Sequence, residues 1–181
     1  MTPFEIVGQI VSIAAMGCNI ISYQQKAQHR LVICQLFGGI LFSISFFLLG
    51  ATVGGLLNLV AAVRAVLFLF PKKFNASHPA WLFGFIGCYV VFYVLTFTVF
   101  GKEPTPFNFI IEFLPLIGMI ATTISYRFSD AKSIRKFGLI SSPAWLVYNI
   151  ANMAVGAILC EVLSLGSIII GIIRLDRMKK Q

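Results

Sequence analysis

Three ionisable side chains lie inside long apolar stretches of this 181-residue chain: Arg64, Glu112 and Glu161. A charged side chain at the centre of a bilayer costs at least about 2.5–3.5 kcal/mol, so it indicates a functional site or a buried partner. If the stretches are membrane helices, the rise per residue puts Arg64 roughly 16 Å deep and the glutamates about 6–9 Å from the outer face.

These depths leave two interpretations open. In the first, Arg64 lies at the floor of a water-filled cavity that opens outward, and a glutamate lies nearer the mouth. In the second, Arg64 forms a structural ion pair that holds its helix against the helix of Glu112 or Glu161, or a glutamate only reaches the outer face of the bilayer.

A stripe of amide and aromatic side chains follows near the C-terminus. Trp145, Tyr148, Asn149 and Asn152 are spaced i, i+3, i+4 and i+7, which puts them on one face of a helix. Amides beside aromatic rings suit a solute that is both hydrogen-bonded and stacked, such as a sugar or a nucleoside. Alternatively, the asparagines hydrogen-bond to neighbouring helices, at about 0.6–2 kcal/mol each, and the rings only pack.

Membrane helices have to position these side chains, because 59% of the residues are hydrophobic and only 11% are charged. A soluble domain has roughly a quarter of its residues charged. The chain divides into apolar runs of the length that crosses a bilayer, and the runs show no strand alternation. We expect an all-α integral membrane protein with seven transmembrane helices, over about 6–23, 31–50, 53–70, 80–100, 106–126, 137–156 and 157–174.

The positive charges predict the orientation. With seven crossings, Lys102 alone lies on one side and Arg64 lies inside a span. The other twelve positive residues lie on the opposite side: Lys26, Arg30, Lys72, Lys73, Arg127, Lys132, Arg135, Lys136, Arg174, Arg177, Lys179 and Lys180. Lys and Arg mark cytoplasmic loops, so we expect the N-terminus outside and the C-terminus in the cytoplasm. We attribute the net charge of +8 to these loops, which could hold anionic lipid headgroups, and not to nucleic-acid binding.

The chain also shows an internal repeat. Ile21-Ser22-Tyr23 recurs at 124–126, an offset of 103, and Gly50-Ala51 recurs at 156–157, an offset of 106, which implies a three-residue insertion. We therefore predict two parallel copies of a three-helix unit, residues 1–79 and 106–181, joined by an uncharged, lipid-facing linker helix within 80–105. Under the 106 offset, the counterparts of the polar stripe are Gly39, Phe42, Ser43 and Phe46.

Three stretches carry a resemblance to a known family: FFLLGATVGGLLNLVAAVRAVL (46–67), EFLPLIGMIATTISY (112–126) and the segment from PAWLVYN to IIRLDRMKK (143–180). They resemble the YgjV family of bacterial inner-membrane proteins, which implies the plasma membrane as location but no defined substrate. The predicted three-plus-one-plus-three order is also similar to that of the SWEET sugar transporters. That similarity implies a central site that includes Asn58, although its counterpart under the 106 offset is Ser164 and not a second asparagine.

Three hypotheses about function follow. The first is a transporter or facilitator of a small polar solute (a sugar, a nucleoside or similar), with its site between the two units. Its expected substrate-binding residues are Asn58, Arg64, Glu112, Trp145, Tyr148, Asn149, Asn152 and Glu161. The second is a non-transporting membrane protein that binds a membrane partner or lipid, and the chain could form a homo-oligomer in either case. The third, an intramembrane enzyme, is disfavoured because the spans hold no HExxH motif, no Ser/Lys or Asp/Asp pair at one depth and no histidine.

We therefore expect no catalytic residue, no cofactor and no metal. The four cysteines lie in apolar runs without CxxC spacing, which is typical of small buried side chains. No acidic residue is expected at the midplane, which favours passive transport.

Overall fold

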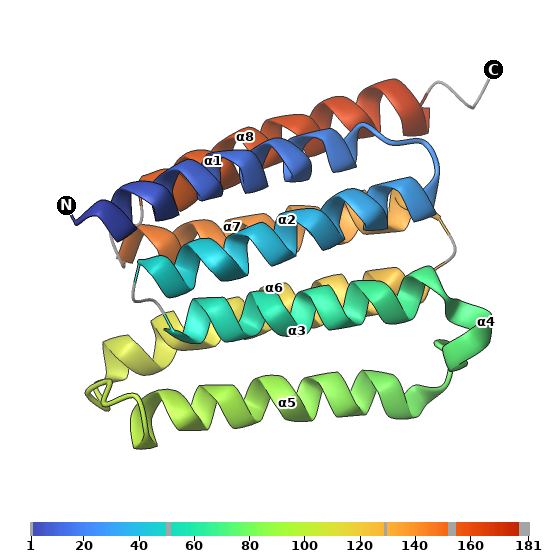
Figure 1. Cartoon of the computed structure of the whole chain (residues 1–181). Helices are drawn as coiled ribbons and strands as arrows, with labels where there is room; N and C mark the ends of the chain where they lie inside the picture. The colour runs from blue at the N-terminus through green and yellow to red at the C-terminus, as the bar shows by residue number, and fades with distance from the viewer. Residues whose placement is uncertain (1, 50–51, 129, 152–154, 178–181) are drawn as a thin grey trace.

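The computed structural model describes residues 2–49, 52–128, 130–151 and 155–177, and within these ranges the chain is helical with short connections. Figure 1 shows the helices running side by side along one axis. In chain order they are α1 (Pro3–Tyr23), α2 (Gln28–Leu48), α3 (Thr52–Leu69), the short α4 (Pro71–Phe74), α5 (Pro79–Thr98), α6 (Pro106–Tyr126), α7 (Ala131–Ala151), α8 (Val155–Gly171) and a π-helical turn, η1 (Ile172–Arg177), that continues α8.

Among the described residues, five stretches are long and apolar enough to cross a membrane: α1, α2, α5, α6 and Gly156–Asp176. The described part of α3, Gly54–Leu69, is apolar but shorter. Helix α7 is as long as α1, but Lys132, Arg135 and Lys136 near its start make it more polar. The prediction of an all-helical protein with several membrane spans is confirmed.

The prediction for the start of α7 was wrong. We expected the helix to begin at 137, but it begins at Ala131, so three of the basic residues assigned to a loop lie in its first turns. Asp130 explains the earlier start, because its carboxylate accepts hydrogen bonds from the backbone N–H of Ser133 at 2.7 Å and from the Ser133 hydroxyl at 2.9 Å. An acidic side chain in this position satisfies the free N–H groups of a helix N-terminus.

The helices form two layers (Figure 1). The first triplet, α1–α2–α3, makes one layer and the second triplet, α8–α7–α6, makes the other. Helix α1 lies against α8, while α3 lies against α6, and α5 closes the edge beside α3 and α6. Phe85 and Tyr89 of α5 are buried in a core cluster with Leu57 and Leu116. The linker helix is therefore packed on one face and exposed on the other, where Phe83 is 68% exposed.

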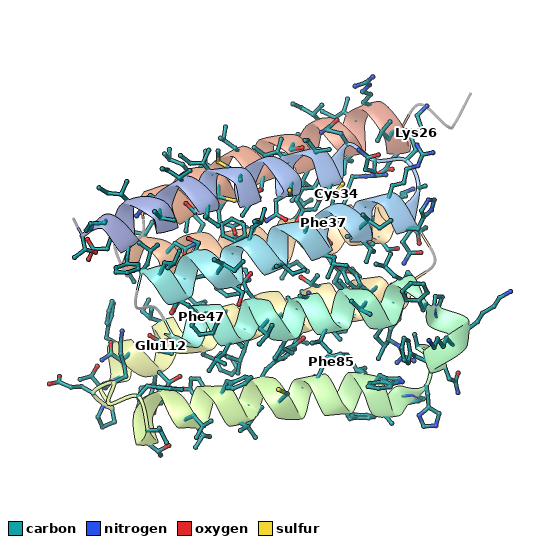
Figure 2. The ribbon with its side chains drawn as sticks, in the orientation of Figure 1. Lys26, Cys34, Phe37, Phe47, Phe85 and Glu112 are labelled. Atoms are coloured by element: carbon teal, nitrogen blue, oxygen red, sulfur yellow. The ribbon has the colours of Figure 1, made fainter. Side chains whose placement is uncertain are left out.

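Most positive charges lie at one end of the bundle, which we name the basic end. It holds the α1–α2 connection, α4, the α6–α7 connection and η1 (Figure 1). Lys26, Lys72, Lys73 and Arg127 lie there, whereas the N-terminus and Lys102 lie at the opposite end. Figure 2 shows Lys26 and Glu112 at these two opposite ends.

The helix bounds recur at a constant offset of 103. Helix α6 begins and ends 103 residues after α1 (3 to 106, 23 to 126), and α7 begins 103 residues after α2 (28 to 131). The predicted three-residue insertion, which falls between residues 50–51 and 152–157, and the predicted end of the sixth span involve residues outside those that the structure describes. Helices α1 and α6 also start alike, because Thr2-Pro3 and Thr105-Pro106 each combine a threonine cap with a proline in the first turn.

Candidate functional site

Arg64 lies near the basic end of α3 and is only 3% exposed. Its Nη1 donates hydrogen bonds to the Tyr89 hydroxyl at 3.1 Å, the Met119 carbonyl at 3.0 Å and the Thr123 hydroxyl at 2.9 Å. The guanidinium also lies over the Tyr126 ring, 5.0 Å from its centroid. Three neutral acceptors and an aromatic face therefore hold this cation in place.

No carboxylate of the described residues lies within salt-bridge distance of Arg64, so neither proposed ion pair with a glutamate exists. Its buried Nε has no hydrogen-bond partner among the described residues. A buried charge without a counter-ion is costly, which makes Arg64 a candidate binding residue.

A cavity of about 110 Å³ lies between the two triplets, and Arg64 lines it. Its walls come from α1, α2, α3, α6, α7 and α8, but not from α5. Five of the predicted site residues line it together: Asn58, Arg64, Trp145, Asn149 and Glu161. The structure thus brings the buried cation, one predicted acid and part of the stripe to one space.

The remaining predicted residues lie elsewhere. Glu112 forms an ion pair with Lys102, with Oε1 and Nζ 3.1 Å apart, at the end opposite the basic end (Figure 2). Tyr148 packs edge-on against Trp145, with ring centroids 5.7 Å apart, and its hydroxyl is within hydrogen-bonding reach of Glu112. Asn152 lies outside the described residues.

Glu161 of α8 brings a carboxyl group to the cavity. The Ser142 hydroxyl of α7 is within hydrogen-bonding reach of this carboxyl group. In the part of the chain that the structure describes, no Lys or Arg lies within salt-bridge distance of Glu161. The cavity therefore presents a guanidinium and a carboxyl group that are not in direct contact.

Tyrosine and glutamine side chains connect the two sides of the cavity. The Tyr126 hydroxyl of α6 donates to the Gln35 side-chain carbonyl of α2. Gln35 in turn lies within hydrogen-bonding reach of Tyr23 of α1. All three residues line the cavity, so its floor on the basic side is polar. Asn19 of α1 lines the cavity as well.

The chain matches the model of the bacterial inner membrane protein family Imp-YgjV over residues 6–179. It belongs to this family. No curated protein and no solved structure matches it. The family and the apolar helices together establish a multi-pass protein of the bacterial inner membrane.

Residues of the YgjV-family cavity occupy equivalent places in the two triplets. With the observed offset of 103, seven pairs of equivalent positions line it with both members: Asn19 and Thr122, Tyr23 and Tyr126, Gly39 and Ser142, Phe42 and Trp145, Phe46 and Asn149, Asn58 and Glu161, Ala61 and Ser164. At this offset the counterpart of Asn58 is Glu161, whereas at the offset of 106 it is Ser164. Ser43, also matched to the stripe by that offset, instead donates to the Gly55 carbonyl at 2.9 Å.

Sequence reasoning missed the partners of Arg64. Tyr89 lies on α5, the helix expected only to face lipid, and it is fully buried. Thr123 of α6 accepts from Arg64 and donates to the Met119 carbonyl at 2.7 Å. No local pattern marks these residues, because their role depends on how α3, α5 and α6 pack together.

The cavity is lined by groups that suit the binding of a polar solute. It offers a guanidinium, a carboxylate, amides, hydroxyls and aromatic rings. Within the described ranges, no three His, Cys, Asp or Glu side chains gather as metal ligands. A polar solute of limited size would find hydrogen-bonding partners on every side.

Proposed function

We propose that this YgjV-family protein is a transporter or facilitator of a small polar solute, with its binding site in the cavity between the two triplets. The observation that carries the proposal is the cavity lined by equivalent positions of both triplets. A binding site at the interface of two repeats is the arrangement that lets them rock about a bound solute.

The proposal includes a parallel repeat, with units 1–79 and 106–181 and a linker in 80–105. Two features support it. The helix bounds recur at one offset, and the packing is compatible with a twofold axis along the helices. Helix α1 lies against α8, and their counterparts α6 and α3 lie against each other, as a twofold exchange of the triplets requires.

We further propose seven crossings, with the N-terminus outside and the basic end in the cytoplasm. Lys26, Lys72, Lys73 and Arg127 at one end, with Lys102 at the other, support this orientation. The first charged turns of α7 then lie in the cytoplasmic headgroup region, where Lys and Arg are favoured near anionic lipids. This placement lets α7 cross the membrane despite its polarity.

The described structure represents a state closed at the basic end. Side chains of the two triplets are hydrogen-bonded there: Gln24 Nε2 donates to the Ser167 hydroxyl at 2.9 Å, and Gln28 Nε2 donates to the Phe128 carbonyl at 2.8 Å. Arg135 Nη1 also donates to the Gln25 carbonyl at 2.9 Å. Opening toward the cytoplasm requires that these contacts break, and rocking of the triplets would break them together.

Uptake into proteoliposomes tests the proposal. Purified protein is reconstituted and offered a broad library of radiolabelled small polar metabolites, and we expect saturable uptake of at least one. Arg64→Ala should abolish that uptake, whereas Arg30→Ala, which removes an exposed arginine of the basic end, should preserve it. A protein that binds and moves no library member would contradict transport. An Arg64→Ala variant that retains full uptake would place the site elsewhere.

A further inference from the structure

The central cavity contains one positive and one negative side chain, and each comes from a different triplet. Arg64 belongs to α3 and Glu161 to α8, and both line the cavity. Neither forms a salt bridge with any described residue. Their equivalent positions in the other triplet are uncharged: Ser167 corresponds to Arg64, and Asn58 corresponds to Glu161.

A neutral solute would leave this arrangement unsatisfied. When a solute displaces cavity water, each charge loses hydration and needs a partner of opposite sign or a strong hydrogen bond. A sugar supplies hydroxyls only, and a simple anion or cation satisfies one charge while it worsens the environment of the other. A solute that carries both charges satisfies both.

We propose that the transported solute is a small zwitterion, whose carboxylate binds Arg64 and whose ammonium group binds Glu161. This inference rests on the proposed transport function and specifies its substrate class. Because Nη1 is held by Tyr89, Met119 and Thr123, the orientation of the guanidinium is set before the solute arrives. The guanidinium is only partly hydrogen-bonded by the described residues, since its Nε has no partner among them, so it retains donor capacity for a carboxylate.

The other lining residues fit the same solute. Phe42 and Trp145 occupy equivalent positions in the two triplets. The face of an aromatic ring carries partial negative charge and therefore attracts an ammonium group. Asn149 is 2% exposed, and its side-chain oxygen has no hydrogen-bond partner in the described chain. It can accept a hydrogen bond from the ammonium group, since an unsatisfied buried acceptor is costly until a donor reaches it.

The size of the cavity suits a compact solute. Its volume is about 110 Å³, and it is partly open to its surroundings. A protein cavity of about 150 Å³ accommodates benzene, which has roughly six non-hydrogen atoms. A compact amino-acid-like zwitterion therefore fits this space.

Four compounds of nearly equal shape test the assignment. L-alanine carries both charges, L-lactate only the negative one, L-alaninamide only the positive one, and L-lactamide neither. Binding to the protein in nanodiscs is measured by calorimetry, and uptake is measured in proteoliposomes. β-Alanine and 4-aminobutyrate extend the panel to wider separations of the two charges. We expect at least one zwitterion of the panel to bind about tenfold or more tightly than the three analogues.

Two substitutions should change selectivity in opposite directions. Glu161→Gln should make alanine bind no more tightly than lactate. Arg64→Gln should make alanine bind no more tightly than alaninamide. If β-alanine or 4-aminobutyrate binds best in the wild type, the single-charge analogues of that compound take the place of lactate and alaninamide. A purely structural role of either residue would weaken all ligands equally. Glu5→Gln and Arg30→Gln, which remove charges outside the cavity, should keep the wild-type order. Should Arg64→Gln fail to fold, Arg64→Lys provides the second variant, with zwitterion preference retained but weakened.

Failure of this inference is distinguishable from failure of transport. If the protein transports a sugar or another neutral solute, but no zwitterion, the substrate class is wrong and transport stands. If no library compound and no panel compound binds or moves, the transport proposal itself fails. If zwitterions bind but neither substitution changes the order of the panel, the roles of Arg64 and Glu161 are wrong.

Discussion

Replacing Arg64 by methionine should abolish uptake and leave the stability of the fold almost unchanged. The structure explains this separation. The three acceptors of Arg64 Nη1 already bond to one another, because Tyr89 and Thr123 are joined through their hydroxyls at 2.9 Å and Thr123 donates to the Met119 carbonyl at 2.7 Å. Without Arg64, none of these polar groups is left unsatisfied, and methionine fills most of the volume with a flexible apolar chain.

The magnitude follows from the balance of two terms. Arg64→Met loses hydrogen bonds to a charged group, each worth about 1.5–3 kcal/mol, but it also removes the desolvation cost of an uncompensated guanidinium, which is several kcal/mol. These terms nearly cancel, so we expect a change in the free energy of unfolding of within about 1 kcal/mol, of either sign.

Arg135→Met provides the matched comparison. Arg135 is 2% exposed, like Arg64, but it forms an ion pair with Asp176 of η1, with Nε and Oδ2 3.0 Å apart. Removing it leaves a buried carboxylate without its cation, which costs about 3–5 kcal/mol. The two substitutions have the same chemistry, but only Arg135→Met is expected to lower the stability substantially.

Unfolding in mixed micelles, with SDS as the denaturant and circular dichroism as the signal, measures both variants under one protocol. Uptake of the identified solute is measured in parallel. An Arg64→Met variant that loses about 3 kcal/mol or more would refute the view that Arg64 is retained for function. Retained uptake in a stable Arg64→Met variant would refute it equally.

Three further predictions concern packing, topology and the cavity. Gly171→Ala should destabilise the fold by about 1–3 kcal/mol in the same SDS titration, because the added Cβ would lie 2.6 Å from the Tyr23 carbonyl oxygen. Gly84→Ala is the control: its added Cβ would have no heavy atom within 4 Å, so this substitution should be neutral or slightly stabilising. In a variant with the four native cysteines replaced, a membrane-impermeant maleimide should label Lys102→Cys in intact spheroplasts but label Lys73→Cys only after lysis; the reverse result would invert the proposed orientation. In a Trp81→Phe background, Trp145 remains as the single tryptophan, and its emission should change when the transported solute binds; an unchanged spectrum at saturating solute would place that solute outside the cavity.

The general architecture could be predicted from the sequence because lipid imposes simple requirements. Apolar runs of spanning length and the absence of strand alternation were sufficient for an all-helical membrane protein. The start of α7 was misplaced because hydropathy alone assigns Lys132, Arg135 and Lys136 to a loop before the helix. The hydrogen bonds from Ser133 to Asp130 show that the helix starts before these residues.

The repeat register illustrates how a weak match misleads. The Ile-Ser-Tyr match gave an offset of 103, at which α6 begins and ends relative to α1, while the Gly-Ala match gave 106. A stronger signal was available, because Thr2-Pro3-Phe4 recurs as Thr105-Pro106-Phe107 at the same 103 and carries the physical role of a helix start. Matches at caps constrain the register better than matches in short turns, since a cap residue has a defined hydrogen-bonding position.

The site could be predicted in part. Buried charge marked Arg64 and Glu161, and the stripe marked Trp145 and Asn149. A four-residue stripe covers a wide arc of the helix, so the sequence could not show which edge faces the cavity; Tyr148 faces Glu112 instead. The partners of Arg64 could not be predicted, because they come from α5 and α6 and depend on packing between distant segments.

The differences between equivalent positions matter as much as the likeness. A cavity with two identical halves would bind a zwitterion equally well in either orientation. Each charged side chain of the cavity would also occur twice, and the two like charges would repel each other. Here the second triplet carries Ser167 where the first carries Arg64, and Ser167 is used for packing, with its hydroxyl donating to the Ile20 carbonyl at 2.8 Å. Asn58 likewise donates to the Gly54 carbonyl of its own helix at 2.9 Å, while its counterpart Glu161 brings a charge to the cavity. In the proposed site, the guanidinium comes from the first triplet and the carboxylate from the second, so the two ends of the cavity differ in charge. A zwitterion can therefore bind in only one orientation.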